Sequence, residues 1–401
     1  MTPIRMLRGA TLAVAALAWC GAAWLLARTS VPALALAGFD QHRFFSAQAL
    51  ARSRSFTRGE EALWLSGTAA TLTALVVLVR RLPSSIRSMG LGRISSAVVA
   101  GMVLLVTLWF VSLPFSLADL WWQHHWGLGP FDVIAWLGGQ WSTLGPAAVS
   151  AMATIVLLVG LAGRFRRWWL LAWPVIVGIA ALFALVSGWL AATSSHPLNN
   201  VSLQADVARI ERVEGVAGTR VRVQDVSSWT SQANAFTVGF GPATHVVLWN
   251  TLLDGRFPRG EIDVVIAHEL GHVRSRHILK GLGWTALIVL PTLWLVALAT
   301  RRRGGVGDPA NLPLVFLTLT VLALLATPAQ NAISRRYEAE ADWRALNATR
   351  EPAAARRLFQ SFERTSLEQP SPPLWDYVLL EDHPTLMQRI AMTERWRAPR
   401  R

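Results

Sequence analysis

Two histidines and a glutamate in the second half of the chain have the spacing of a metal hydrolase. His268, Glu269 and His272 form an H-E-x-x-H motif in a segment, 261–278, with the pattern of a helix. A spacing of four places both imidazoles on one helical face, about 5–6 Å apart at Cβ, so both can bind one Zn²⁺. Glu269 is turned by about 100° from His268 and can reach a water on that metal. The motif predicts a zinc hydrolase with Glu269 as general base.

A third ligand is expected farther along the chain, because a hydrolytic zinc site needs three protein ligands and one position open to water. The best candidate is Glu338, in a helix predicted over residues 329–347. Asp342 lies one turn beyond it, where its carboxylate can accept a hydrogen bond from a ligand histidine. The alternative for this segment is a solvated charged helix. Glu340 points away from Glu338, and His277 lies on another face of the zinc helix, so both are expected to be solvated.

Long apolar stretches must position these residues at a membrane. A spanning helix needs roughly 20 mostly apolar residues. Seven stretches qualify, five before the H-E-x-x-H motif and two between it and Glu338. They are Gly9–Ala27, Ala62–Val79, Ile94–Ala118, Leu144–Gly163, Trp168–Ala192, Gly281–Thr300 and Leu312–Thr327.

The first stretch also has features of a cleaved signal peptide. Arg5 and Arg8 precede the apolar run, and the small residues at 35–37 would suit a cleavage site. The run is longer than the roughly 7–15 apolar residues of a signal peptide, however, and Arg28 interrupts it before that site. We therefore expect a retained first helix.

The remaining polar chain forms two regions, each with a zinc motif. Apolar spacing predicts a helix over 203–214 and strands over 221–226, 234–238 and 245–249. The fold class is a mainly α membrane protein with a small β-sheet in its catalytic part. The predicted organisation is five membrane helices in 1–192, a catalytic region with the zinc helix in 193–280, two membrane helices in 281–328, and the third-ligand helix with a C-terminal catalytic region in 329–401.

The composition excludes several other classes of protein. Charged residues make up 15% of the chain and hydrophobic residues 53%, the opposite of a disordered protein. The single Cys20 excludes a disulfide scaffold. The net charge of +14 would suit a nucleic-acid partner, but the arginines abut apolar runs, where cations contact lipid headgroups. We therefore expect membrane lipid and no nucleic acid as a partner.

These motifs resemble the M48 family of membrane metalloproteases, and in particular its CAAX prenyl protease (Ste24-like) branch. That branch follows H-E-x-x-H, after two membrane helices, with S-R-x-x-E-x-x-A-D, which matches residues 334–342 here. Residues 234–236 (N-A-F) resemble the branch's edge strand, and residues 382–389 (D-H-P-T-L-M-Q-R) resemble its C-terminal His-Pro element with a following arginine. Five helices before the zinc helix favour this branch over the HtpX-like branch, which has fewer.

The resemblance implies a seven-helix membrane protein with a zincin-like (gluzincin) domain and a role for each matching residue. His268, His272 and Glu338 would bind one Zn²⁺ per chain, with Glu269 as general base. Asp342 would support a ligand or donate a proton, and His383 would stabilise the transition state. Asn234, Ala235 and Phe236 would contact an extended substrate. Arg335 and Arg389 would support the ligands.

The hypothesis from the sequence is a zinc-dependent membrane endopeptidase of the CAAX prenyl protease type, acting on a peptide or protein that is prenylated or embedded in the membrane. One alternative is an HtpX-like quality-control protease for misfolded membrane proteins or exported peptides. A seven-helix receptor, a transporter or a pseudoprotease would not explain two complete zinc motifs. Lys280 is the single lysine among many arginines, which suggests a bacterial source and so a bacterial cell membrane.

The side of the membrane on which catalysis takes place stays open. The resemblance implies a cytosolic catalytic domain. A cytoplasmic N-terminus, however, would place twelve arginines of the short segments inside and five outside, which favours a catalytic domain outside the cytoplasm. The twelve are Arg5, Arg8, Arg80, Arg81, Arg87, Arg93, Arg164, Arg166, Arg167, Arg301, Arg302 and Arg303, and the five are Arg28, Arg43, Arg52, Arg54 and Arg58.

Overall fold

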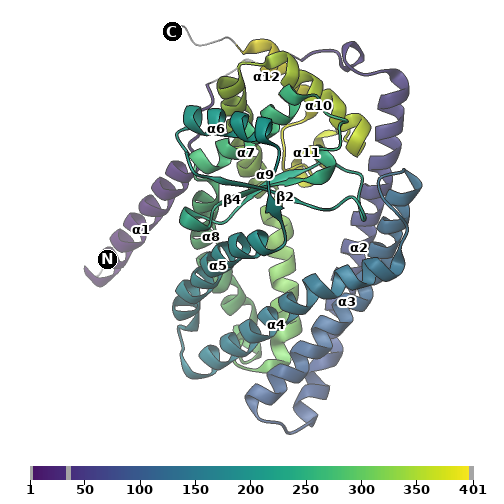
Figure 1. Ribbon diagram of the computed structural model, residues 1–401. Coiled ribbons are helices and arrows are strands. Elements are labelled where there is room, and N and C mark those ends of the chain that lie inside the picture. The colour runs from purple at the N-terminus through teal and green to yellow at the C-terminus, as the bar shows by residue number, and fades with distance from the viewer. Residues whose placement is uncertain (1–2, 33–37, 397–401) are drawn as a thin grey trace.

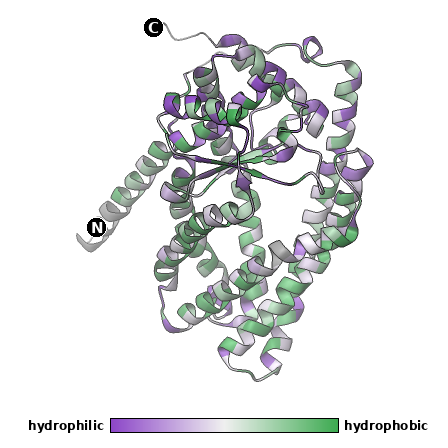
Figure 2. Ribbon diagram, in the orientation of Figure 1, coloured by the Kyte–Doolittle hydropathy of each residue, from purple (hydrophilic) through white to green (hydrophobic). Residues whose placement is uncertain are grey.

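The apolar stretches form long helices that stand next to a smaller, more polar domain (Figures 1 and 2). The computed structural model describes residues 3–32 and 38–396. Within them, six helices are long and apolar enough to cross a membrane, and the first helix has a shorter apolar part, Ala13–Ala27. The class predicted from the sequence, a mainly helical membrane protein, is confirmed. The helices are α1 (Pro3–Ala27), α2 (Ala47–Ser88), α3 (Arg93–His125), α4 (Val133–Arg164), α5 (Trp168–Thr193), α8 (His277–Thr300) and α9 (Leu312–Thr349).

The first helix packs against the rest of the molecule through its C-terminal half. The indole N–H of Trp19 donates to the carbonyl of Leu287 in α8 at 3.1 Å, and the carbonyl of Leu26 accepts from the Tyr337 hydroxyl of α9 at 2.7 Å. The expected cleavage site at 35–37 lies outside the described residues.

Two helices differ from their predicted bounds. The zinc-motif helix α7 (Arg259–Arg274) ends before residue 278, because Arg276 takes a left-handed conformation (φ 54°) and α8 begins at His277. The last apolar stretch and the third-ligand segment form one continuous helix, α9, although Pro328 lies inside it. Glu338 is therefore carried on the extension of a membrane helix.

A four-stranded sheet lies over the end of the helical bundle, with the strand order β1-β2-β4-β3. The strands are β1 (His196–Pro197), β2 (Arg220–Gln224), β3 (Ala235–Val238) and β4 (His245–Trp249). The predicted strands at 221–226, 234–238 and 245–249 are confirmed to within two residues, and β1 was not predicted. β4 lies in the interior, parallel to β2 and antiparallel to β3. Its residues are almost all buried. β3 is the last strand in the order, so it lies at the edge of the sheet.

Helices cover the sheet and enclose one hydrophobic core. This core joins α6 (Val201–Glu214), α7, α10 (Pro352–Ser366), α12 (Leu386–Arg395) and the C-terminal end of α9. Ile266 and Leu270 of α7 are fully buried in it, as is Leu346 of α9. α7 and α9 pack against each other along their length, so side chains on their facing sides are held at a fixed distance from one another.

The catalytic domain rests on the bundle through a close contact between two glycines. Gly188 of α5 lies against Gly239, which has φ +74° in the turn after β3. A Cβ on Gly188 would come within 2.2 Å of the carbonyl oxygen of Ala243. Only glycine permits this approach, so the β3–β4 hairpin is placed directly on a membrane helix.

The opposite end of the bundle is rich in arginine. The loops after α2, α4 and α8 come together there, where Arg87 donates to Asp308 at 2.7 Å and Gly307 packs against Gly163. The arginines at this end are Arg80, Arg81, Arg87, Arg93, Arg164, Arg166, Arg167, Arg301, Arg302 and Arg303. In this part of the described chain, Asp308 forms an ion pair with one of these arginines, Arg87.

Candidate active site

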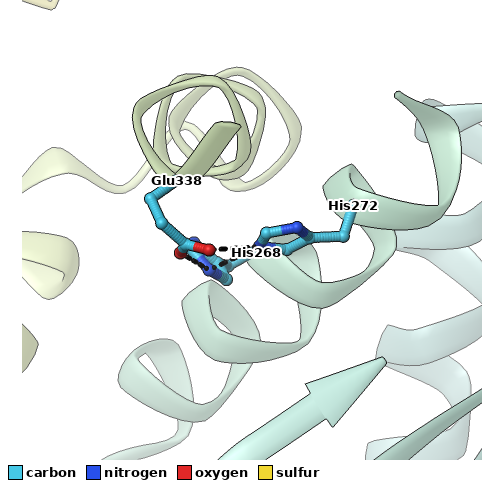
Figure 3. A group of neighbouring side chains, drawn as sticks. All are labelled: His268, His272 and Glu338. Atoms are coloured by element: carbon cyan, nitrogen blue, oxygen red, sulfur yellow. Dashed lines mark hydrogen bonds and ion pairs between the residues drawn. The ribbon is translucent and has the colours of Figure 1, made fainter. Parts of the chain in front are cut away.

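The three candidate metal ligands come together from two helices (Figure 3). His268 and His272 of α7 point towards Glu338 of α9. The His268 Nε2 lies 3.1 Å from Glu338 Oε2, and the His272 Nε2 lies 3.5 Å from Glu338 Oε1. The side chains are 12%, 16% and 13% exposed, so the group is sheltered but open on one side. All its ligand atoms lie within 4.8 Å of one another.

The free electron pairs of this group suit a metal ion. The Nε2 atoms of the two histidines are only 3.0 Å apart, and the Nδ1 atom of each ring is engaged elsewhere. The Glu338 Oε2 is buried, and ring nitrogens of His268 and His383 lie 3.1 and 3.3 Å from it. Two imidazoles and a carboxylate that converge in this way form a donor set used for catalytic metal ions.

His268 is held from behind by a charged pair. Its Nδ1 lies 2.9 Å from Asp342 Oδ1, and the Arg389 guanidinium of α12 donates to both oxygens of Asp342 at 2.8 and 2.7 Å. Burial by itself lowers the pKa of His268, but hydrogen bonds to Asp342 and Glu338 outweigh it and raise the pKa to about 9. Burial raises the pKa of Asp342, whereas Arg389 and His268 lower it, to about 2. Asp342 is therefore ionised and orients His268 through an Nδ1–H donor.

His272 is held by a second histidine, which the sequence did not predict. The Nδ1 of His277 lies 2.9 Å from the Nδ1 of His272, and the Nε2 of His277 lies 3.0 Å from Glu340 Oε2. The expectation that His277 and Glu340 are solvated is wrong, since they are 7% and 3% exposed. Because α7 ends at Arg274, the chain turns back and places His277 against His272 instead of continuing the helix.

The hydrogen bonds fix which nitrogen of His277 carries the proton. Burial lowers the pKa of His277 to about 4, against the opposing effect of its hydrogen bond to Glu340, so its ring is neutral. A carboxylate only accepts, so His277 donates from Nε2 to Glu340. Its Nδ1 then accepts from the Nδ1–H of His272, which leaves the Nε2 lone pair of His272 facing Glu338.

The N-terminal segment completes this second support. The backbone N–H and the hydroxyl of Ser30 donate to Glu340 Oε1 at 2.8 and 2.7 Å. The ammonium of Lys280 lies 3.4 Å from Glu340 Oε2 and donates to the carbonyl of Arg28. Tyr337 stacks on the ring of His277, with centroids 4.4 Å apart. The segment after α1 therefore contacts the back of the metal site.

Glu269 is buried beside the ligands and is oriented by the edge strand. The hydroxyl of Thr237 in β3 donates to Glu269 Oε2 at 2.8 Å and is 3.0 Å from the Glu269 carbonyl. One carboxylate oxygen is thereby fixed, and Glu269 lines the cleft beside His268. Thr237 had not been predicted, because no spacing in the sequence connects it with Glu269.

His383 approaches the same carboxylate from the C-terminal region. Its Nε2 lies 3.3 Å from Glu338 Oε2 and its Nδ1 lies 2.7 Å from Asp382 Oδ1. Its side chain is 45% exposed towards the cleft. Arg335 supports this segment, since its guanidinium donates to the carbonyls of Tyr377 and Glu381.

A cleft of about 340 Å³ runs past these residues. Asn234 and Ala235 line it next to His268 and Glu269, whereas Phe236, the third predicted substrate contact, is not among its lining residues. The Asn234 carbonyl accepts from the Trp249 N–H at 3.0 Å, so this end of β3 is anchored to β4 on one side. Its other side is the edge of the sheet.

Comparison with known proteins assigns this arrangement to a family. The sequence pattern of peptidase family M48 matches residues 191–397, which is just over half of the chain. The chain belongs to peptidase family M48. It is 28% identical over 243 residues to the "uncharacterized metalloprotease YhfN" of Bacillus subtilis (strain 168), and that match spans 57% of each protein.

Other known proteins match different shares of the chain. A "protease HtpX homolog" of Kineococcus radiotolerans is 29% identical over 307 residues, which are 68% of this chain and 97% of that protein. A "CAAX prenyl protease 1 homolog" of Oryza sativa subsp. japonica is 26% identical over 198 residues, 46% of each. The crystal structure of S. mikatae Ste24p has the same fold, with a TM-score of 0.72 over 94% of this chain and 96% of that chain, at 17% identity.

Proposed function

We propose that this M48 protein is a zinc-dependent membrane endopeptidase. The observation that carries the proposal is the convergence of His268, His272 and Glu338, with His268 and the buried carboxylate of Glu269 lining a cleft bordered by an edge strand. Two histidines and one glutamate leave a fourth position for water, which is the pattern of catalytic zinc. A bound zinc ion would lower the pKa of water to about 7 and polarise a peptide carbonyl.

Glu269 carries the proton in this proposal. Thr237 holds one oxygen of its carboxylate, so the other oxygen is directed at the cleft, where it removes a proton from the attacking water. The same carboxylate then passes the proton to the nitrogen of the leaving amine. Asp342 does not compete for this role, because with a pKa of about 2 it holds no proton to donate.

The remaining residues bind and polarise the substrate. Asp382 and Glu338, against burial, raise the pKa of His383, so its imidazole keeps an N–H that can donate to the developing oxyanion. The outer edge of β3 borders the cleft at Asn234 and Ala235, and an extended peptide would add there as a further strand, displacing the Asn234 side chain that now accepts from the Ala235 N–H at 2.8 Å. Phe236 does not line the cleft, so its contribution to substrate binding would be limited to its place in β3.

The substrate class that we propose is a peptide of the CAAX type, with a lipid-bearing cysteine. The fold likeness to Ste24p over nearly the whole chain and the similarity to the CAAX prenyl protease 1 homolog support it. The HtpX homologues support a second candidate, cleavage of unmodified membrane or exported polypeptides. These two candidates differ in whether the prenyl group contributes to binding.

The decisive experiment uses purified protein in detergent with one extended peptide, with and without a C-terminal prenyl-cysteine. Glu269→Gln is the matched control: it should keep bound zinc, measured by mass spectrometry, and lose at least about a thousandfold in kcat/KM, because general acid–base catalysis is removed. Normal turnover by this variant would refute the proposed role of Glu269. Equal cleavage of both peptides would retain the endopeptidase and replace the CAAX label with general membrane proteolysis.

We also propose an orientation in a bacterial cell membrane. The arginine-rich end of the bundle lies opposite the catalytic domain, and the positive-inside rule places that end in the cytoplasm. The catalytic domain would then face away from the cytoplasm, in contrast with the cytosolic side implied by the family resemblance. A reporter fused after Arg401 that is active only inside the cell would refute this orientation.

A further inference from the structure

A second cavity, of about 520 Å³, opens between membrane helix α2 and the chain that leads to His383. It is formed by one face of α2, by residues 366–369, and by α11 (Leu374–Leu379) with the two residues that follow. It shares Ser366, Glu368 and Glu381 with the wall of the catalytic cleft. The two cavities are therefore neighbours, and a peptide in the cleft can extend a side chain into the second one.

This cavity, called the acidic pocket below, is lined by five carboxylates. They are Glu60, Glu61, Glu368, Asp376 and Glu381. The aromatic side chains of Phe56 and Trp64 form part of its wall. Among the described residues, none of the five carboxylates forms an ion pair with a lysine or an arginine.

Asp376 is the most buried carboxylate of the acidic pocket. It is only 1% exposed, its Oδ2 has no hydrogen-bond partner, and it faces Glu61 within hydrogen-bonding reach. Burial and the nearby Glu61 carboxylate raise the pKa of Asp376 to about 6. Burial and neighbouring acids likewise raise the pKa of Glu381, to about 7. A buried carboxylate without a partner is costly, and a cation in the pocket would remove that cost.

The dimensions of the acidic pocket favour an organic cation over a metal ion. A metal ion needs several oxygens within about 2.3–2.6 Å of one point. Among the described residues, His268, His272 and Glu338 form the group whose side chains lie close enough to hold one metal ion. The carboxylates of the acidic pocket, all within the described chain, do not form such a group. Aromatic walls together with carboxylates suit an ammonium or guanidinium group on an alkyl chain.

We propose that the acidic pocket binds a lysine or arginine side chain of the peptide substrate and selects for it at one position near the scissile bond. The proposal rests on the endopeptidase function proposed above. The connection through Ser366, Glu368 and Glu381 places this side chain on the part of the peptide that passes His383. Glu61 and Asp376 together would then neutralise its charge.

The experiment compares a neutral peptide with a series in which lysine replaces glutamine at one position after another. For the unmodified protein we expect one position at which lysine raises kcat/KM about tenfold over glutamine, the gain from one partly desolvated charge pair. Asp376→Asn and Glu61→Gln should each reduce this lysine-to-glutamine ratio to about twofold or less. Asp225→Asn, which removes an exposed acidic charge outside both cavities, is the matched control and should leave the ratio unchanged.

A binding measurement keeps this test independent of catalysis. Fluorescently labelled lysine and glutamine peptides are titrated with the Glu269→Gln protein, with and without Asp376→Asn, and their Kd values are compared. Absence of a lysine preference at every position, or a preference that survives Asp376→Asn, would overturn the proposal. Binding of Ca²⁺ or Mg²⁺ that depends on Asp376, without any lysine preference, would also overturn it and assign the pocket to a metal ion. Lysine-selective binding without hydrolysis by the unmodified protein would instead refute the endopeptidase function alone.

Discussion

The two histidines proposed as metal ligands lie one helical turn apart, yet different parts of the molecule support them. His268 is held by Asp342 and Arg389, a buried charged pair formed entirely within the catalytic domain. His272 is held through the neutral ring of His277, which leads to Glu340, at the junction with membrane helices α1 and α8. The first support depends on the packing of the C-terminal helix, and the second depends on how the catalytic domain sits on the membrane part.

The group behind each histidine also differs in charge: Asp342, behind His268, is an ionised carboxylate, and His277, behind His272, is a neutral imidazole. Hydrogen bonds to two carboxylates outweigh burial and raise the pKa of His268 to about 9, whereas burial lowers the pKa of His277 to about 4. A ligand backed by a carboxylate is a stronger base than one backed by a neutral imidazole. The comparison therefore predicts a strong, pH-dependent contribution from the side of His268 and a weaker, pH-independent one from the side of His277.

The largest effect is expected from Asp342→Ala. It removes the acceptor of His268 and leaves the buried Arg389 without its partner. We expect zinc affinity to fall about a hundredfold and the free energy of unfolding to fall by about 3–5 kcal/mol. Competition with a chromophoric chelator and thermal unfolding in detergent measure the two quantities.

A double variant separates the two consequences of that change. Asp342→Ala with Arg389→Met removes the unpaired charge, so stability should recover, while zinc affinity should stay low because His268 still lacks its acceptor. Recovery of zinc affinity in the double variant would contradict the role of Asp342 as the group that orients His268.

A smaller effect is expected from His277→Phe. Phenylalanine can keep the stacking on Tyr337 but cannot accept from His272. We expect zinc affinity to fall about tenfold, the lower end for a lost partner of a ligand. Glu340→Gln is the matched control, since its amide oxygen can still accept from His277, and it should change affinity by less than about threefold. Equal losses in the two variants would show that charge, not proton placement, is what matters here.

The pH dependence of zinc binding should come from the side of His268. With a pKa of about 9, metal-free His268 holds a proton that zinc must displace, so affinity should rise about tenfold per pH unit between pH 7 and 8.5. The same proton stabilises the metal-free protein below pH 6.5, and that contribution is lost as the pH rises through 9. In Asp342→Asn the pKa of His268 falls, so the slope should flatten, whereas His277→Phe should leave it unchanged. Calorimetric titration at several pH values provides the measurement.

The smallest effect is expected from Ser30→Ala. The change removes one donor to Glu340 but keeps the backbone N–H, which donates to the same oxygen at 2.8 Å. A single hydrogen bond contributes about 1 kcal/mol, and only part of that reaches the metal through Glu340 and His277. We expect zinc affinity to change by less than about threefold in the chelator competition assay. A tenfold loss would show that the N-terminal segment controls the site more directly than the relay suggests.

The placement of the candidate site residues on two helices was predictable because helical spacing is local. The positions of His268, Glu269 and His272 on one helix, and of Glu338 and Asp342 on another, follow from a repeat of 3.6 residues. The apolar stretches predicted the membrane helices for the same reason, since their length alone matches the bilayer. The edge strand was placed to within one residue, at Ala235–Val238.

The residues that the sequence did not reveal all depend on contacts between elements. Thr237 reaches Glu269 only because the sheet lies over α7, and no pattern along the chain connects the two. The acidic pocket joins α2 with α11, which are about three hundred residues apart in the chain. Such pairs are brought together by packing of the whole core, which spacing within one segment cannot encode.

The sequence by itself determined that this protein is a membrane protein with an H-E-x-x-H helix and a carboxylate pair on a later helix, because these features depend on composition and on the local geometry of each helix. Only the tertiary structure decided how each ligand is oriented. His277 and Glu340 were expected in solvent, but a single left-handed residue, Arg276, ends α7 early and turns His277 inward against Glu340 of α9. The left-handed conformation of Arg276 is unfavourable by itself, and contacts of His277 and Glu340 with α8, α9 and the segment after α1 offset it. The orientation of the site is therefore set by the fold as a whole.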